Sequence, residues 1–214
     1  MGNILAVFAH PDDEAFGPSG TLSKLSKIND VYLVCVTRGG GQQSKYKNLR
    51  KRRSAELRNS ARIMGVKKVF FFNFEDGCLC NKNYHKLAAK IQEKVNVTKS
   101  DTLITFEPRG VSGHIDHIAV SMVSTFVFER SRRLKTLLYF CLNKAQRALE
   151  GKYFIYFPPG YGLHEINYTV DISDYYEKKK QTIMAHKSQM FDGEKYLKNH
   201  NEELKKEHFI KLSK

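Results

Sequence analysis

The sequence has only five prolines and four cysteines among its 214 residues, and it contains no long apolar run. Because proline is sparse and no Ser/Gly-rich segment or internal repeat marks a linker, we expect one domain over residues 1–214. Four cysteines do not indicate a disulfide framework in a chain of this length. A membrane span needs about 18 consecutive apolar residues, and a secretory signal needs a basic leader. Both are lacking, which predicts a soluble, cytoplasmic protein.

Acidic residues are also in the minority, with 22 Asp and Glu against 36 Lys and Arg and a net charge of +14. Such an excess is typical of nucleic-acid-binding proteins. The positive charge concentrates in residues 45–62 and in the C-terminal third. The first of these segments has the apolar spacing of an amphipathic helix, and Tyr46 is its only aromatic residue for base stacking. We therefore expect a solvated helical face and a preference for anionic small ligands, and no nucleic-acid partner.

Short apolar segments alternate with longer amphipathic ones along the first two thirds of the chain. The apolar segments predict strands, and the amphipathic segments predict helices. The strands are expected at 3–9, 31–37, 68–73, 102–106 and 136–142, and the helices at 18–28, 46–64, 83–96 and 115–130. Strand and helix in alternation are typical of α/β proteins with right-handed crossovers, so we expect a mostly parallel sheet with helices on both faces.

The remainder of the chain predicts a more mixed arrangement. Residues 152–157 and 168–172 are candidate late strands on either side of a loop that is rich in proline and glycine. Ser173 is a candidate N-cap for a helix that runs to about Met190. From about residue 191 we expect a polar, helical C-terminal tail.

The most informative segment is H-P-D-D-E at residues 10–14, which directly follows the apolar strand predicted at 3–9. Burying charge at the exit of a buried strand costs on the order of several kcal/mol unless the charge has a partner, and a metal ion would be such a partner. Imidazole and carboxylate are ligands of zinc and similar divalent ions. The alternative is that Asp12 or Asp13 caps the next helix. For the whole pentapeptide we favour a metal site.

A second group of candidate residues follows the strand predicted at 102–106. Only eight histidines occur in the chain, and His114 and His117 lie three apart here, on either side of Asp116. On the first turn of a helix both imidazoles can face the same side, so that one binds a metal and the other contacts a substrate. Because α/β sheets gather their ligands at the carboxyl ends of parallel strands, we expect this segment to meet residues 10–14.

Three consecutive glycines occur in residues 37–43, after the second predicted strand. A dinucleotide site is not indicated, because the G-x-G-x-x-G pattern is absent and the loop does not follow the first strand. Two interpretations stay open at this point. The loop is either a flexible wall of an active site or a simple long connection.

With these motifs the chain resembles the LmbE/PIG-L superfamily of zinc-dependent de-N-acetylases. The A-H-P-D-D-E motif of that family is matched by residues 9–14, and its H-x-D/N-H motif by residues 114–117. Two further segments are similar, namely R-x-x-E-L at 53–57 and A-H-x-S-Q at 185–189. The resemblance implies an LmbE-like, Rossmann-like α/β fold, and it spans most of the chain.

The resemblance also implies roles for individual residues. His10, Asp13 and His117 would bind Zn²⁺, or another divalent metal, and leave one position for a water molecule whose pKa the metal lowers. Asp12 would act as general base. His114 would stabilise the oxyanion of the tetrahedral intermediate or protonate the leaving amine. The residues by themselves do not decide which of Asp12 and Asp13 binds the metal, so this assignment comes from the resemblance.

Arg53 and His186 are the candidate substrate-binding residues, because they lie in the two further segments that match the family. They would line or brace the site. For each of them a second interpretation stays open. Arg53 could equally be a surface charge paired with Glu56, and His186 could be a structural residue behind the site.

The G-V-S-G-H segment at 110–114 is most similar to the eukaryotic-type branch, the N-acetylglucosaminyl-phosphatidylinositol de-N-acetylases. The resemblance therefore implies a hydrolase that removes the acetyl group from an N-acetylglucosamine conjugate, with an anionic or lipid-linked conjugate as the expected small-molecule partner. Two alternatives stay open. One is an amidase acting on a thiol-pathway or antibiotic-precursor sugar conjugate, and the other is a basic protein that binds nucleic acid or anionic surfaces. Assembly into a homo-oligomer is left open as well.

Overall fold

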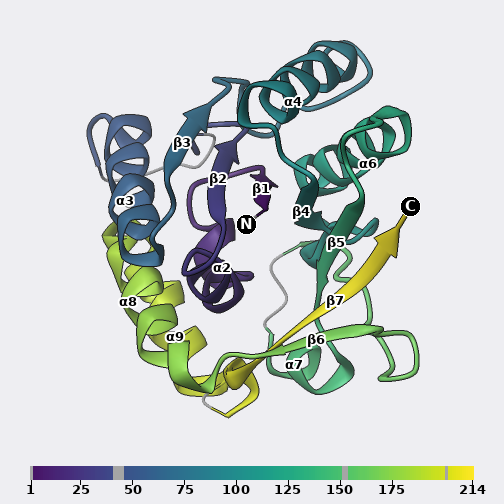
Figure 1. Cartoon of the computed structure of the whole chain (residues 1–214). Helices are drawn as coiled ribbons and strands as arrows, with labels where there is room; N and C mark the ends of the chain where they lie inside the picture. Colours follow the sequence, from purple (N-terminus) through teal and green to yellow (C-terminus); the bar gives the residue numbers. More distant parts are fainter. Residues whose placement is uncertain (1, 41–45, 151–153, 201) are drawn as a thin grey trace.

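The computed structural model describes residues 2–40, 46–150, 154–200 and 202–214, and its centre is a seven-stranded sheet (Figure 1). The strand order is β3-β2-β1-β4-β5-β7-β6. The first five strands are parallel, as the sequence predicts. They are β1 (Asn3–Phe8), β2 (Asp30–Cys35), β3 (Lys68–Phe71), β4 (Thr102–Phe106) and β5 (Thr136–Cys141). The predicted mostly parallel α/β sheet is therefore confirmed.

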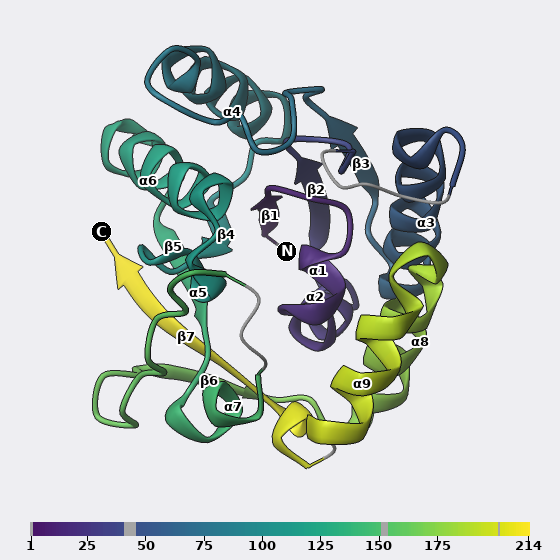
Figure 2. The same ribbon diagram turned by 180° about the vertical axis from the view of Figure 1, so that it is seen from behind.

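Helices cover both faces of this sheet (Figures 1 and 2). On one face α4 (Tyr84–Thr98) packs beside α6 (Ile115–Arg130). On the other face lie α2 (Ser19–Leu25), α3 (Leu49–Met64) and α8 (Tyr176–Ala185). The remaining helices are α1 (Asp13–Phe16), α5 (Gly110–Gly113), α7 (Lys144–Leu149) and α9 (Met190–His200). The four helices predicted from the amphipathic segments are all present, and α2 is shorter than the predicted 18–28.

The apolar run that precedes residue 10 forms a central strand. β1 pairs with β2 on one side and with β4 on the other, and Leu5, Ala6 and Val7 have no exposed surface. A strand that is covered on both faces must be apolar throughout, because neither face offers water to a polar side chain. The first polar side chain after this run is His10, at the point where the chain leaves the sheet.

The C-terminal part differs from the prediction in several places. Residues 154–157 form no strand, and residues 152 and 153 of the strand expected there lie outside the described residues. The next expected strand is present as β6 (Tyr168–Asp171). The helix expected from Ser173 begins as a 3-10 turn, and α8 ends at Ala185 instead of near Met190.

The predicted polar tail contains α9, but its last part is a strand, β7 (Lys206–Ser213), which lies antiparallel between β5 and β6. The helical expectation is wrong there because buried polar residues hide the strand pattern. Glu207 is buried against Lys179. His208 is buried with Asn143 and Thr169 within hydrogen-bonding distance of its two ring nitrogens.

The Lys179–Glu207 ion pair, with 2.6 Å between Nζ and Oε1, is almost completely buried. Lys179→Met is expected to lower the free energy of unfolding by about 3–5 kcal/mol, because it leaves a buried carboxylate without its counter-ion. Urea unfolding followed by circular dichroism measures this loss. Lys180→Met is the matched control, since Lys180 pairs with the exposed Glu177 and surface pairs contribute about 0–1 kcal/mol. Equal losses in the two variants would contradict the prediction.

The strand order reverses between β1 and β4, which are neighbours at the centre of the sheet. In α/β sheets the carboxyl ends of the strands at such a reversal form the usual place for a ligand. Both motifs singled out in the sequence begin at these two strand ends. Among the helices of the described residues, none is long and apolar enough to cross a membrane.

Candidate active site

The two motifs meet at the carboxyl ends of β1 and β4. Residues 10–14 lead from β1 into α1, and His114 and His117 stand at the start of α6. His10 and His117 are 107 positions apart in the sequence, yet their rings are in contact. The parallel pairing of β1 with β4 brings them together, as the sequence analysis expects.

His10, Asp13 and His117 each direct one potential ligand atom to a common point. His10 Nδ1 lies 3.1 Å from His117 Nε2, which lies 3.2 Å from Asp13 Oδ1. All three side chains are largely buried. Two imidazole nitrogens that face each other beside a carboxylate form a donor set that suits a divalent ion with a remaining open position. These residues therefore fit the metal that the sequence analysis expects.

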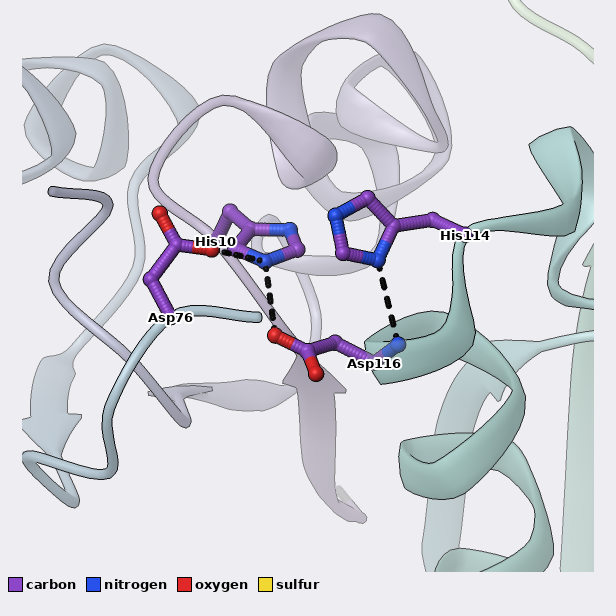
Figure 3. A group of neighbouring side chains, drawn as sticks. All are labelled: His10, Asp76, His114 and Asp116. Atoms are coloured by element: carbon purple, nitrogen blue, oxygen red, sulfur yellow. Dashed lines mark hydrogen bonds and ion pairs between the residues drawn. The ribbon is translucent and has the colours of Figure 1, made fainter. Parts of the chain in front are cut away.

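The far nitrogen of each imidazole faces an acceptor, which leaves the near nitrogen free to bind a metal. His117 Nδ1 lies 3.0 Å from the carbonyl oxygen of Gly110. His10 Nε2 lies 3.2 Å from Asp116 Oδ2 and 3.0 Å from Asp76 Oδ1 (Figure 3). Acceptors behind a metal-binding histidine fix its tautomer and the orientation of its ring.

A second group of potential ligands shares one histidine with the first. Its members are His10, Asp76, His114 and Asp116 (Figure 3). We interpret this group as the support of the first, because the oxygens of Asp116 already accept the N–H groups of Gly77 at 2.7 Å and Leu79 at 3.0 Å. His10 is shared through its other nitrogen, Nε2, which must carry the proton to donate to these carboxylates.

The neighbouring carboxyl groups of Asp12 and Asp13 have pKa values that are shifted in opposite directions. Burial raises the pKa of Asp12 to about 6, with a further contribution from the charge of Asp13 and opposition from Arg53. Burial alone would also raise the pKa of Asp13, but His117 and His10 outweigh it and hold that pKa well below its usual range. Asp13 is therefore a permanent anion, whereas Asp12 can take up a proton near neutral pH.

Arg53, on α3, reaches into the first motif. It is only 4 % exposed, and its Nη2 donates to the carbonyl oxygen of Pro11 at 2.7 Å and to Asp12 Oδ2 at 2.9 Å. The alternative that Arg53 is a surface charge paired with Glu56 is wrong, since Arg52 makes that pair. The helix-cap alternative is not supported either, because the N-cap of α2 is Pro18 and the side chain of Asp12, at the N-cap position of α1, makes no capping hydrogen bond.

His114 is held in one tautomer by the helix that it caps. Its Nδ1 accepts the backbone N–H of Asp116 at 3.0 Å, so the proton of the neutral ring is on Nε2 (Figure 3). Burial, together with the nearby His10 and His117, lowers the pKa of His114 to about 4. A neutral imidazole can donate a hydrogen bond from its Nε2–H to a developing oxyanion.

His186 does not lie where it can touch a bound molecule. The side chain is completely buried at the end of α8, and its Nε2 lies 2.7 Å from Glu14 Oε1. Although burial alone would lower the pKa of His186, the Glu14 carboxylate raises it. The burial of His186 and its contact with Glu14 therefore favour the interpretation of a brace behind the site over a contact with the substrate.

The segment that contains His186 also ties the site to α3. Ser188 donates its backbone N–H to Glu56 Oε1 at 2.9 Å and its hydroxyl to Glu56 Oε2 at 2.6 Å. The next residue, Gln189, lines the pocket described below. The segments at 53–57 and 185–189 thus contact each other through Glu56 and Ser188. Arg53 links the first of these segments to Asp12.

A cavity of ≈ 370 Å³ opens beside the potential metal ligands. Asp12, Asp13 and His117 form its polar end. The rest of its wall consists of Phe16, Gly17, Phe106, Val111, Ser112, Phe140, Leu142, Glu150, Phe154, Phe157, Gln189 and Tyr196. Aromatic and aliphatic side chains dominate this wall, and within the described chain no Lys or Arg lines it. An apolar pocket with a few convergent polar groups is the usual form of a small-molecule site.

Sequence reasoning missed Asp76, which follows β3. The available signal was an acidic residue after a parallel strand, the same signal that identified the first motif. The described part of the glycine loop lies beside this residue, because the N–H of Gly40 donates to Asp76 Oδ2 at 2.8 Å and Gly39 packs against the guanidinium of Arg53. The loop therefore borders the site, while residues 41–43 lie outside the described residues.

Glu107, directly after β4, was missed as well. Its buried carboxylate accepts the N–H groups of Arg109 and Val111, each at 2.8 Å, and the hydroxyl of Tyr161 at 2.7 Å. These bonds fix the turn that leads to His114, in which Val111 has an unusual φ of 62°. An acidic residue at the end of a buried strand is again the signal that was available.

The strand order and the His/Asp group at the reversal between β1 and β4 define an α/β protein with a possible metal site beside an apolar pocket. Residues 5–127 match the family described as PIG-L, GlcNAc-PI de-N-acetylase. The chain is 32 % identical over 205 residues to diacetylchitobiose deacetylase of Thermococcus kodakarensis, covering 87 % of this chain and 69 % of that protein. It is 31 % identical over 124 residues to a probable N-acetylglucosaminyl-phosphatidylinositol de-N-acetylase of Dictyostelium discoideum, covering 55 % and 46 %.

The fold is similar to that of N,N'-diacetylchitobiose deacetylase from Pyrococcus horikoshii in complex with its inhibitor MPG. The TM-score is 0.73 at 21 % identity, over 99 % of this chain and 84 % of that one. The chain belongs to the PIG-L family of de-N-acetylases, which are amide hydrolases. Family membership favours an enzyme over the alternative of a basic binding protein.

Proposed function

We propose that this protein is a zinc-dependent hydrolase that removes the acetyl group from an N-acetylglucosamine conjugate with an apolar aglycone. The observation that carries the proposal is the convergence of His10, Asp13 and His117 beside the Asp12 carboxylate, at the polar end of an apolar pocket. Family membership supports the reaction. The donor set of two imidazole nitrogens and one carboxylate oxygen supports zinc, because catalytic zinc sites use three such ligands and keep one position open.

His10, Asp13 and His117 would hold a divalent ion, and the ion would supply Lewis acidity toward an amide carbonyl and lower the pKa of a water molecule. Asp12 accepts a proton from water as the water oxygen attacks the carbonyl carbon. Its pKa of about 6 suits this task near neutral pH. Arg53 binds Asp12 Oδ2, so the role proposed for Arg53 is to hold this carboxylate and not to bind the substrate.

His114 completes the chemistry of the proposed site. Its Nε2–H donates a hydrogen bond to the carbonyl oxygen as negative charge develops there. When the C–N bond breaks, the proton taken up by Asp12 passes to the amine nitrogen, and acetate and the free amine leave. Of the two roles expected for His114, the neutral tautomer supports stabilisation of the oxyanion over protonation of the amine.

The wall of the pocket favours one kind of conjugate. A hydroxyl-rich partner would leave its hydrogen-bonding groups without partners against the aromatic side chains, which costs free energy. A hydrocarbon group beside the sugar gains free energy there. We therefore favour an N-acetylglucosamine whose aglycone is hydrocarbon next to the sugar over the polar conjugates of the thiol pathway. N-acetylglucosaminyl-phosphatidylinositol fits this wall less well, because its sugar is attached to a hydroxyl-rich inositol that carries a phosphate. A preference for anionic conjugates has no support from the described pocket wall, which lacks basic side chains.

Octyl N-acetylglucosaminide is expected to show at least about tenfold higher kcat/KM than methyl N-acetylglucosaminide. Burial of two methylene groups contributes about 1.6 kcal/mol, and about 1.4 kcal/mol corresponds to a factor of ten. The measurement is release of free amine by the zinc-loaded protein, below the micelle concentration of the octyl substrate. Equal kcat/KM values would contradict the proposed preference for an apolar aglycone without contradicting the proposed deacetylation. No amine release from any N-acetylglucosaminide would overturn the proposed function itself.

A further inference from the structure

Asp12 is held in a backbone conformation that it would not adopt by itself. Its φ is 127° and its ψ is −24°. For a residue other than glycine, such a conformation costs on the order of 1–3 kcal/mol and persists only where the surroundings impose it. The contacts that impose it lead away from the pocket, to Glu14 and His186. We propose that Glu14 and His186 are positioning residues that fix the orientation of the Asp12 carboxylate, a proposal that rests on the proposed role of Asp12 as proton acceptor.

The peptide unit between Pro11 and Asp12 is held from two sides. Arg53 donates to its carbonyl oxygen at 2.7 Å, and Glu14 Oε2 accepts its N–H at 3.0 Å. Rotation of this peptide plane would relieve the unusual φ of Asp12, but it would break both hydrogen bonds. The two contacts therefore act as a clamp that keeps the Asp12 side chain turned toward the pocket.

Glu14 is itself fixed from the protein interior. Its Oε1 accepts the hydroxyl of Ser60 at 2.8 Å and lies 2.7 Å from His186 Nε2. The residue has no exposed surface, so these partners do not compete with solvent. Charge-assisted hydrogen bonds are stronger than neutral ones, and they gain further strength where water is excluded. Ser60 belongs to α3 and His186 follows α8, so two helices outside the motif determine where Asp12 points.

The potential metal ligands are fixed by different contacts. Asp13 Oδ2 accepts the backbone N–H of His10 at 2.6 Å, and His117 is oriented by the carbonyl oxygen of Gly110. Loss of the acceptor on Glu14 should therefore disturb Asp12 and leave the ligand group in place. A variant of Glu14 that keeps its metal but loses turnover would therefore show that Glu14 positions Asp12 and is not needed to build the metal site.

Glu14→Gln tests the clamp, because it removes one acceptor oxygen without changing the volume of the side chain. We expect the backbone amide hydrogen of Asp12 to exchange with solvent at least about tenfold faster, since its hydrogen bond is weakened. We expect kcat to fall by about 10- to 100-fold, the loss typical of a misplaced catalytic group, while KM and zinc content stay unchanged.

Glu207→Gln is the matched control. Glu207 is equally buried, is paired with Lys179, and accepts backbone N–H groups from Gly20 and Thr21, but it does not contact Asp12. This variant is expected to lose stability without any change in the exchange of the Asp12 amide or in kcat. A comparison of the two glutamine variants therefore separates positioning from stability.

His186 is tested by a pair of variants. His186→Leu removes the donor to Glu14, and His186→Gln returns one, because the amide nitrogen of glutamine can take the place of Nε2. We expect kcat to fall in the leucine variant and to recover in part in the glutamine variant. In a double variant, Glu14→Gln should add little to the loss caused by Asp12→Asn, because the group that Glu14 positions is already absent.

Two results would overturn the proposal even for an active deacetylase. One is an unchanged exchange rate of the Asp12 amide in the Glu14→Gln variant. The other is a fall in kcat on Glu14→Gln that is as large in the Asp12→Asn variant as in the parent protein. Absence of amine release by the parent protein would instead overturn the proposed function. In that case the exchange measurement still decides whether Glu14 and His186 hold Asp12.

Discussion

Asp12→Asn is expected to bind as much zinc as the parent protein and to lose about 10²- to 10⁴-fold in kcat. The asparagine side chain has nearly the same shape, but its amide cannot accept the proton that the reaction releases from water. His10, Asp13 and His117 are unaltered in this variant, so metal content should stay near one ion per chain. Elemental analysis together with single-turnover rates of amine release measures both quantities.

His114→Ala is the companion to this variant. It removes the proposed donor to the oxyanion, and loss of one such donor costs about 10²- to 10³-fold in kcat. Zinc content should again be retained, because His114 belongs to the supporting group and not to the ligand group. A loss of zinc from both variants would mean that the ligands and the catalytic residues have been interchanged.

Replacement of a metal ligand is expected to have the larger effect. His10→Ala and His117→Ala should each reduce the metal content from one divalent ion per chain to nearly none after dialysis, with activity falling in parallel. Each variant removes one of three protein ligands, and the Asp13 carboxylate would then share the ion with a single imidazole. Elemental analysis of the dialysed proteins makes the comparison.

His85→Ala serves as the control for both ligand variants. His85 is exposed on α4, and its ring packs against Tyr84. This variant should keep its metal and its activity. Undiminished metal in His10→Ala would assign the ion to other residues.

The central sheet and the meeting of the two motifs were predictable because both follow from burial. Parallel strands covered on both faces must be apolar, so the strands stand out in the sequence, and polar residues directly after them stand out as well. His10 and His117 were identified in this way. Applied to every strand end, the same rule would have found Glu107, which directly follows β4, whereas Asp76 lies five residues beyond the end of β3.

What could not be predicted depends on contacts between distant parts of the chain. Glu14 and His186 are 172 positions apart, and no local pattern connects a glutamate after the first strand with a histidine at a helix end. The resemblance marks Arg53 as a candidate, but its burial and its contact with Asp12 are not visible in the sequence, where it directly follows three exposed basic residues at 50–52. The different tasks proposed for Asp12 and Asp13 depend on backbone conformation and on neighbouring charges, which a pair of identical letters does not reveal.

The position of β7 in the sheet has a consequence for synthesis of the protein. Among the described strands β6 pairs only with β7, although β6 is synthesised well before it. While the ribosome is adding residues 172–205, β6 has no partner and the outer edge of β5 stays open. An open strand edge is a template for pairing with another chain. Translation therefore has to reach β7 before this edge is closed, and a chain that stalls earlier would expose β5 to chaperones or to aggregation.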